Sequence, residues 1–213
     1  DATFTWEWMH ITEDFYKKKT GLDSLYHVLQ KYQTAFPAAA YRMYFTSNHD
    51  ENTWNGTEYE KYAELAKALA VFSFTWNGIP LIYSGQEKPN LKRLAFFEKD
   101  NIDWNAEYRL HDFYKTLSGL RKRNPSLRAA DASVTTFLIS TSAGKPVLCY
   151  LRKKENDEVL VLINLSANKT GFTINDQAVN GFFIDIFSNA EMHLRADTFI
   201  EMQPWAFLVF EKK

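Results

Sequence analysis

The amino-acid sequence predicts an α/β region followed by an all-β region. Up to about residue 127, short apolar and β-prone segments alternate with helical patterns, which is typical of a parallel sheet whose strands are covered by helices. Beyond about residue 130, apolar residues recur with a period of two, in short strands that turns separate. We therefore expect two domains, residues 1–127 and residues 128–213.

The first elements of the α/β region are an aromatic run, two helical patterns and a strand. The aromatic run is Phe4–Trp8, and the helical patterns cover Met9–Lys19 and Asp23–Tyr32. Tyr41–Ser47 is apolar and β-prone, and it runs directly into the polar cluster Asn48–Asn52. This succession predicts a strand that ends in a polar loop.

A further helix, strand and helix follow. Thr57–Phe74 has a strongly helical pattern that ends at Asn77–Gly78, and Ile79–Tyr83 is a short apolar strand. The order of elements is therefore βαβαβ. Glu107–Arg123 predicts another amphipathic helix, which a following proline terminates. Three strands of this kind do not close a barrel by themselves.

The C-terminal region has the pattern of an antiparallel β-sandwich. Its clearest strands are Val147–Leu151, Val159–Ile163 and Phe207–Phe210. Turn residues at Ser142–Gly144 and Glu155–Asp157 separate strands of this region. Short strands at such spacing favour two packed antiparallel sheets.

Composition excludes several classes of protein. The chain has 213 residues, of which 46% are hydrophobic and 24% charged, as expected of a globular protein with a substantial core. The 25 basic and 26 acidic residues nearly cancel, so neither nucleic acid nor an anionic membrane is an expected partner. The longest apolar run, Ala66–Phe74, is far shorter than the roughly 20 residues of a membrane span.

The single cysteine and the first residue carry less information. Cys149 excludes an internal disulfide, and its strand-like surroundings predict a buried structural thiol. Asp1 is followed by no basic and apolar segment of the kind that begins a signal peptide, so we expect the numbering to start inside a longer protein. The sequence does not determine the cellular compartment of the protein, and the periplasm and the cell exterior are both among the alternatives.

Polar residues follow the strand at Tyr41–Ser47, where a parallel β/α architecture holds its catalytic groups. Asn48, His49 and Asp50 occupy this place. A plain turn is the alternative, because Asn and Asp favour loops and helix caps. Trp54 is a candidate for stacking on a sugar ring, with a lid on the core as the alternative.

Two motifs with one helix between them carry a resemblance. They are Phe45-Thr-Ser-Asn-His-Asp50 and Gly78-Ile-Pro-Leu-Ile-Tyr-Ser-Gly-Gln-Glu87. Both resemble signatures of the α-amylase superfamily of glycoside hydrolases, family thirteen, in which they mark the seventh and eighth barrel strands, and the interval suits one βα unit. Further segments also resemble this family, the last three its C-terminal sandwich domain: Arg93–Trp104, Leu120–Leu127, Val159–Leu165, Gly181–Ser188 and Met202–Trp205.

The resemblance implies a fold and roles for the candidate residues. Residues 1–127 would supply strands six to eight of a (β/α)8 TIM barrel, with Phe4–Trp8 as strand six, and residues 128–213 the β-sandwich. Asp50 matches the carboxylate that stabilises the oxocarbenium-like transition state and is neither nucleophile nor acid. His49 matches the residue that hydrogen-bonds the same sugar. An imidazole suits this role, because it can donate from one nitrogen while the other nitrogen orients the ring. Asn48 is expected to shape the loop and joins His49 and Trp54 among the substrate-binding candidates.

The two bond-breaking carboxyl groups are expected to lie outside this chain. Retaining glycosidases use a nucleophile and a general acid about 5 Å apart, and in this family they end strands four and five. Glu7 is the early candidate, but one βα unit separates it from Asp50, whereas strands five and seven are two units apart. Glu87 has a routine role as a cap or ion-pair partner among its alternatives.

Metal sites are not expected in this chain. The histidines other than His49 show no metal-ligand spacing, and they are His10, His27, His111 and His193. The resemblance implies calcium as an option for the complete protein, with ligands in segments that precede this chain. No cofactor is expected in the chain itself.

The leading hypothesis is a fragment of a retaining hydrolase of α-linked glucans, such as starch and maltooligosaccharides, that is inactive alone. A transglycosylase or isomerase of the same superfamily stays open, as does a non-catalytic carbohydrate-binding or scaffold module. A three-strand slice of a barrel leaves a sheet edge uncovered. The expected partners are therefore an α-glucan and either the missing N-terminal barrel part or a second copy of the chain.

Overall fold

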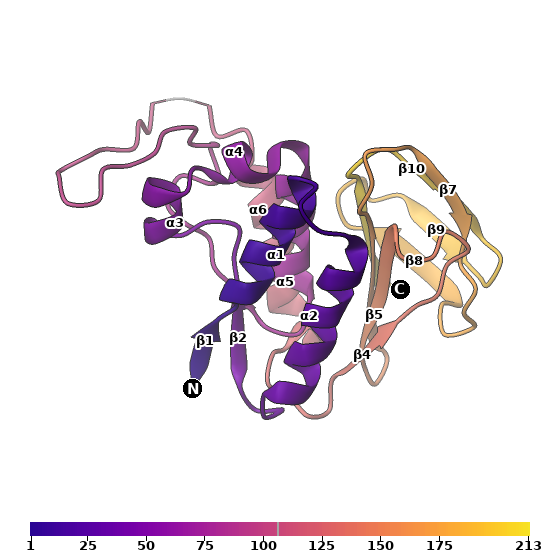
Figure 1. The fold of residues 1–213 in the computed structure, drawn as a ribbon. Coiled ribbons are helices and arrows are strands. Elements are labelled where there is room, and N and C mark those ends of the chain that lie inside the picture. The colour runs from indigo at the N-terminus through magenta and orange to yellow at the C-terminus, as the bar shows by residue number, and fades with distance from the viewer. Residues whose placement is uncertain (106) are drawn as a thin grey trace. The chain divides into compact units, whose positions relative to one another are not determined.

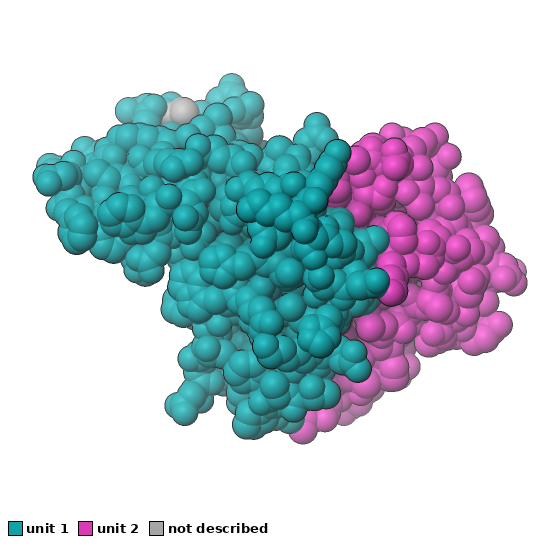
Figure 2. All heavy atoms as spheres, viewed as in Figure 1, with its two compact units in different colours: residues 1–74, 78–119 teal, residues 75–77, 120–213 magenta. Residues whose placement is uncertain are grey.

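The computed structural model describes residues 1–105 and 107–213, and it divides into two compact units (Figure 2). Unit 1 comprises residues 1–74 and 78–119, and unit 2 comprises residues 75–77 and 120–213. The expected domain boundary between residues 127 and 128 stays a prediction.

A parallel three-stranded sheet organises unit 1 (Figure 1). Its strands are β1 (Ala2–Phe4), β2 (Tyr41–Tyr44) and β3 (Ile79–Pro80), in the order β1-β2-β3. Both pairings are parallel, with Thr3 opposite Arg42 in the first. The segments between the strands contain helices, as parallel neighbours require. The predicted α/β class and the order of its elements are confirmed.

Helices connect the strands of this sheet. They include α1 (Trp6–Tyr16) and α2 (Leu22–Ala35) before β2, α5 (Ala66–Thr75) before β3 and α6 (His111–Arg123) after it. Each of these helices buries apolar side chains, among them Met9, Leu25, Val28, Leu29, Leu69, Val71, Phe72, Leu117 and Leu120. In α1, α2 and α6 the buried side chains lie on one face, as the predicted period requires, whereas α5 is buried on nearly all sides.

The aromatic run Phe4–Trp8 divides between two elements, which corrects its assignment to a single strand. Strand β1 ends at Phe4, and helix α1 begins two residues later. Thr5 makes the change of direction, because its backbone N–H and its hydroxyl both donate to the Met43 carbonyl, at 3.1 and 2.9 Å. The Thr5 carbonyl then accepts from the Met9 N–H and so starts the helix.

The polar cluster after β2 is helical, so the prediction of a loop over Asn48–Asn52 is wrong. Helix α3 spans His49–Trp54, and Asn48 caps it with its side-chain oxygen. Two acidic residues occupy its first turn, where the partial positive charge of the helix N-terminus favours them. The polar residues that suggested a loop are therefore those of a helix start.

The helix predicted over Thr57–Phe74 is interrupted. Helix α4 (Glu58–Tyr62) is followed by the 3-10 turn η1 (Ala63–Leu65) and then by α5. The break lies at Ala63, whose φ of 42° is in the left-handed region. Strand β3 is also shorter than expected, because the backbone N–H of Tyr83 is bonded to the Gln86 side chain at 2.5 Å instead of to a neighbouring strand.

Unit 2 contains two antiparallel sheets, as the sequence predicts. The six-stranded sheet has the order β4-β5-β6-β11-β8-β9, and β10 pairs with β7 in the other. Their bounds are β4 (Thr135–Leu138), β5 (Val147–Lys154), β6 (Asp157–Asn164), β7 (Thr170–Thr173), β8 (Gly181–Asp185), β9 (Glu191–Leu194), β10 (Phe199–Met202) and β11 (Phe207–Lys212).

Side chains from both sheets share one core in unit 2. Cys149 and Leu160 from the larger sheet meet Phe172 and Ile200 from the smaller one. This arrangement is that of a β-sandwich. Burial raises the pKa of the Cys149 thiol well above its usual range, so the group is a neutral part of the core.

The 3-10 turn η2 (Pro125–Leu127) precedes the sandwich strands. The buried Arg152 of β5 donates to the Ser126 and Arg128 carbonyls at 3.1 and 2.9 Å. Hydrogen bonds of this kind satisfy a charge that burial would otherwise make costly. Across the described part of the chain, no helix is both long and apolar enough to cross a membrane.

Candidate functional site

The candidate residues lie at the carboxyl end of β2, on the short helix α3. Asn48 is buried, whereas the side chains of His49 and Asp50 are 66% and 43% exposed. The His49 Nε2 atom lies 3.6 Å from an Asp50 carboxylate oxygen. The segment thus has a buried anchor followed by an imidazole and a carboxylate that a ligand can reach together.

Asn48 holds the start of α3. Its Oδ1 accepts the backbone N–H of Glu51 at 2.8 Å, which satisfies one of the free donors of the first turn. Its Nδ2 is buried, and the described residues offer it no acceptor. The amide oxygen is therefore occupied by the cap, and direct contact between Asn48 and a substrate stays a prediction.

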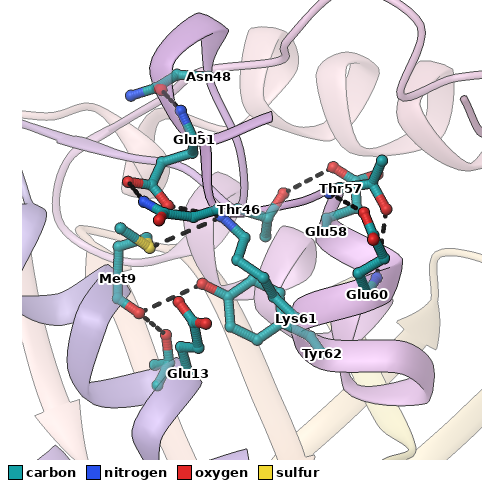
Figure 3. Close-up of polar contacts among 12 residues, drawn as sticks. Met9, Glu13, Thr46, Asn48, Glu51, Thr57, Glu58, Glu60, Lys61 and Tyr62 are labelled. Atoms are coloured by element: carbon teal, nitrogen blue, oxygen red, sulfur yellow. Dashed lines mark hydrogen bonds and ion pairs between the residues drawn. The ribbon is translucent and has the colours of Figure 1, made fainter. Parts of the chain in front are cut away.

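A buried ion pair fixes the other side of α3 (Figure 3). The Lys61 Nζ lies 3.0 Å from Glu51 Oε2, and the two side chains are 0% and 4% exposed. Asn55 donates to the second oxygen of Glu51 at 3.0 Å, and the Met9 sulfur of α1 lies 4.0 Å from the ammonium. Because a buried charge is stable only when paired, this contact strongly favours one position of α3 against α4.

A second buried carboxylate connects the ends of β2 and β3. Glu58 accepts from the Thr46 hydroxyl at 3.4 Å (Figure 3) and from the Gln86 amide. Gln86 also donates to Thr46 at 2.7 Å, and its oxygen accepts the Tyr83 N–H. Gln86 therefore ties the loop after β3 to the residues that follow β2.

Burial dominates the electrostatics of Glu58. Desolvation raises the pKa of this carboxyl from 4.5 to about 7. Hydrogen bonds from Gln86, Tyr59 and Thr46 and the charge of Lys61 act in the opposite direction. The Glu58 carboxyl therefore holds its proton to a much higher pH than an exposed glutamate does.

Trp54 ends α3 and does not cover the core of unit 1. It is 58% exposed, and its ring centroid lies 5.4 Å from that of Phe96 and 6.4 Å from that of Phe97. The two phenylalanines belong to the loop between β3 and α6. An exposed ring beside His49 and Asp50 fits the stacking alternative, and contact with a sugar stays a prediction.

The other carboxylates singled out from the sequence lie elsewhere. Glu7 is in the first turn of α1 and pairs with Lys31 at 2.7 Å on an exposed surface. Glu87 accepts the Gly85 backbone N–H at 3.2 Å, which is a local capping contact. Within residues 1–105 and 107–213, no group of three or more His, Cys, Asp or Glu side chains is placed to hold a metal ion.

Sequence reasoning missed the buried Glu51–Lys61 pair and the Glu58–Gln86 contact. A separation of ten residues between Glu51 and Lys61, or 28 between Glu58 and Gln86, has no periodic signal. The usable signal was local: Thr57 and Glu60 form a capping box, which marks the start of α4. That start directs Glu58 and Lys61 inward.

Fold and site together define a class. A parallel β/α layer with exposed polar groups after a strand, followed by a β-sandwich, is the arrangement expected of the C-terminal part of a barrel glycosidase. The family model described as "Alpha amylase, catalytic domain" matches residues 2–95, and that described as "Maltogenic Amylase, C-terminal domain" matches residues 138–209. The chain belongs to the α-amylase superfamily, and it matches a catalytic domain followed by a C-terminal domain of such proteins.

Relatives extend the comparison. Alpha-amylase MalA of Haloarcula japonica is 31% identical over 140 residues, which cover 65% of this chain and 20% of that protein. The maltogenic alpha-amylase of Bacillus acidopullulyticus is 22% identical over 203 residues, which cover 91% of this chain and 33% of that protein. The chain therefore spans only a fifth to a third of the length of these two relatives.

A solved structure shows the same fold. The noncanonic maltogenic alpha-amylase AmyB from Thermotoga neapolitana matches with a TM-score of 0.83 at 18% identity, over 100% of this chain and 50% of that one. An alpha-amylase from Lactobacillus plantarum matches with a TM-score of 0.78, also at 18% identity, over 100% of this chain and 48% of that one. The partial barrel followed by a sandwich is therefore confirmed as the fold class.

Proposed function

We propose that this chain is the C-terminal part of a retaining glycoside hydrolase that acts on α-linked glucans such as starch and maltooligosaccharides. The observation that carries the proposal is the exposed His49–Asp50 pair at the carboxyl end of β2, in a chain of the α-amylase superfamily. Relatives that support the substrate class are named alpha-amylase, maltogenic alpha-amylase and cyclomaltodextrinase.

Asp50 is the proposed transition-state stabiliser. Its carboxylate would accept hydrogen bonds from sugar hydroxyls, and these bonds strengthen as positive charge develops on the ring. His49, 3.6 Å away, would donate to the same sugar. The buried anchors on both sides of α3 support this role, because a stabilising group must already be in place when charge develops.

The nucleophile and the general acid are proposed to come from outside this chain. Near α3, Glu51 and Glu58 are buried and engaged in hydrogen bonds, and Glu7 pairs with Lys31 on α1. None of the three is free to lie about 5 Å from a second carboxyl across a glycosidic bond. We therefore expect the isolated chain to hydrolyse no starch.

The uncovered sheet supports a polypeptide partner. All three residues of β1 are exposed, and β1 is at one edge of the sheet in unit 1. Such an edge pairs readily with another strand. The proposed partner is an N-terminal barrel part or a second copy of the chain. Light scattering that showed a stable monomer without a partner would contradict this.

The decisive experiment compares Asp50→Asn with the unchanged complete protein that carries this chain. We expect the turnover of maltooligosaccharide, measured as reducing ends, to fall at least about 100-fold. Glu7→Gln is the matched control, since it removes an exposed carboxylate of the same unit that is paired on α1. Equal turnover by Asp50→Asn would refute the role, and reducing-sugar release by the isolated chain would refute its predicted inactivity.

Transglycosylation is the second candidate function. The exposed rings of Trp54 and Phe96 beside His49 favour it, because they offer a place for an acceptor sugar where hydrolysis needs only water. Analysis of products from maltotriose separates the two activities. A hydrolase releases only shorter sugars, whereas a transglycosylase also forms sugars longer than its substrate.

A further inference from the structure

A buried lysine without a partner among the described residues lies in the loop between β3 and α6. Lys88 is only 6% exposed, and residues 1–105 and 107–213 offer its ammonium neither a hydrogen bond nor an ion pair. Lys61, the other buried lysine of unit 1, has a carboxylate oxygen of Glu51 at 3.0 Å. Because an unpaired buried charge is costly, we expect Lys88 to receive its counter-charge from a bound group.

Lys88 lines a pocket of about 540 Å³ on unit 1. The other charged residues of its lining are Lys92, Asp103, Glu107 and Arg109. A pocket of this volume is within the usual range for small-molecule sites. The ammonium is therefore part of a wall that a small ligand can reach.

Backbone hydrogen bonds join the two segments that form this pocket. The Leu110 N–H donates to the Glu87 carbonyl at 2.9 Å, and the Lys88 N–H donates to the Gly85 carbonyl at 3.2 Å. Lys88 directly follows Glu87, and Arg109 directly precedes Leu110, so the bond between the two segments brings both cations to one pocket. Their positions are fixed before a ligand arrives, which lowers the cost of binding.

The lining offers charged groups of both signs. Lys92 is engaged in an ion pair within the same loop, whereas Lys88 and Arg109 form no ion pair within the described part of the chain. Asp103 accepts a backbone N–H of its own turn at 2.9 Å through Oδ1, and Glu107 supplies a second carboxylate. A ligand that suits this pocket therefore carries an anionic group for the two cations and hydroxyl donors for the two carboxylates.

We propose that this pocket binds a phosphate monoester carried by a sugar. The phosphate accepts hydrogen bonds from Lys88 and Arg109, and hydroxyl groups of the sugar donate to Asp103 and Glu107. A guanidinium matches two phosphate oxygens through parallel N–H groups, and an ammonium acts as a point charge beside it. Phosphate recognition goes beyond the proposed function, and only the choice of glucose as the sugar rests on it.

The location of the pocket supports a phosphate site. Asp103 also lines a second pocket, of about 760 Å³, which Tyr83 and Ser84 line where the chain leaves β3. The proposed site is thus next to the carboxyl end of β3, the last strand of the partial barrel. In (β/α)8 barrels the loops after the last two strands are a frequent place for phosphate binding.

Isothermal titration calorimetry of the complete protein that carries this chain tests the site with glucose 6-phosphate at fixed ionic strength. Lys88→Met keeps the length of the side chain and removes its charge, and we expect it to weaken binding about ten- to a hundredfold. Arg109→Gln should weaken binding by a smaller factor, because Arg109 is exposed. Lys99→Met, at an exposed lysine of the same loop, changes the net charge equally and is the matched control that should bind as the wild type does.

Thermal unfolding separates a ligand site from a structural ion pair. Without ligand, Lys88→Met should unfold at the same temperature as the wild type or at a higher one, because it removes an unpaired buried charge. Glucose 6-phosphate should raise the Tm of the wild type and of Lys99→Met, and not that of Lys88→Met. If a carboxylate from another segment of the complete protein pairs with Lys88, Lys88→Met lowers the Tm and the wild type binds no phosphate, which overturns the inference.

Free phosphate and glucose distinguish the sources of the ligand chemistry. We expect inorganic phosphate and glucose each to bind more weakly than glucose 6-phosphate, and Glu107→Gln to reduce the preference for glucose 6-phosphate over inorganic phosphate. Equal affinity for inorganic phosphate would assign the pocket to free phosphate, and equal affinity for glucose would remove the anionic group from the account. Either result overturns the assignment to a sugar phosphate, as does equal binding by Lys88→Met.

Failure of this inference is distinguishable from failure of the proposed function. Asp50→Asn should abolish turnover of maltooligosaccharide and leave the affinity for glucose 6-phosphate unchanged. Binding that depends on Lys88, without any hydrolysis, would contradict the proposed function and keep the phosphate site. Hydrolysis that depends on Asp50, in a protein that does not bind glucose 6-phosphate, would do the reverse.

Discussion

Replacing Lys61 with methionine tests whether the buried ion pair holds α3 in place. Methionine fills a similar length of space but carries no charge, so Lys61→Met removes the ammonium 3.0 Å from Glu51 and little else. Glu51 keeps its hydrogen bond from Asn55 on the other oxygen. The change therefore leaves a buried carboxylate without its counter-charge, directly after Asp50 in the sequence.

The size of the effect follows from the geometry of the pair. Two unit charges 3.0 Å apart attract by about 5 kcal/mol at an effective dielectric constant of about 20. Desolvation of both groups offsets much of that attraction in the folded protein, so the pair itself contributes little. Removing one member is different, since the other stays buried, and we expect a loss of about 3 to 5 kcal/mol.

Hydrogen exchange of peptides that cover residues 46–62 measures this loss where it arises. We expect their protection to fall by a factor of about 10² to 4 × 10³ in Lys61→Met, which is the loss of 3 to 5 kcal/mol converted at about 1.4 kcal/mol per factor of ten. Lys31→Met is the matched control, because it breaks an exposed pair with Glu7 on the same unit and should leave these peptides unchanged. Adding Glu51→Gln to Lys61→Met removes the stranded charge and should restore most of the protection.

Equal protection in the two lysine variants would show that the Glu51–Lys61 pair does not hold α3 in place. Unchanged protection of residues 46–62 in Lys61→Met would mean that the carboxylate finds water or another partner at no cost. No recovery on adding Glu51→Gln would mean that packing around Lys61, and not charge, is what the variant disturbs. Either result would remove the ion pair from the account of how Asp50 is positioned.

Two further predictions concern the same segment. Desolvation raises the pKa of Glu58 from 4.5 to about 7, so its contribution to stability is full below pH 4.5 and is lost as the pH rises towards 7, by up to about 3 kcal/mol. Denaturant titrations across this range should show that slope in the wild type and a smaller one in Glu58→Gln. Asn48→Ala removes the cap of α3 and should cost about 1 kcal/mol by the same titrations, whereas Asn48→Asp keeps an acceptor and should cost less. A loss as large in Asn48→Asp as in Asn48→Ala would contradict the capping role.

Much of the fold could be predicted because it follows from local patterns. The strand at Tyr41, the helix over 111–123 and the sandwich strands around Val147, Val159 and Phe207 each have a period that depends on neighbouring residues alone. Their limits were less accurate. The run Phe4–Trp8 divides at Thr5 because of two hydrogen bonds to Met43, which lies 38 residues away.

The candidate site was predictable in part. The order of residues placed Asn48, His49 and Asp50 after a strand, and the resemblance assigned their roles. The same polar residues suggested a loop, whereas the structure has helix α3 there. A cap and a loop share residue types, so only the backbone geometry separates them.

The sequence by itself therefore determined the class of this protein, its succession of elements and the motif at the end of β2. Tertiary structure alone decided which carboxylates are exposed and which are buried, because Asp50, Glu51 and Glu58 have the same chemistry in the sequence and differ only in what packs around them. It also brought Phe96 to His49 across 47 residues, through hydrogen bonds from Asn52 and Thr53 that no local period encodes.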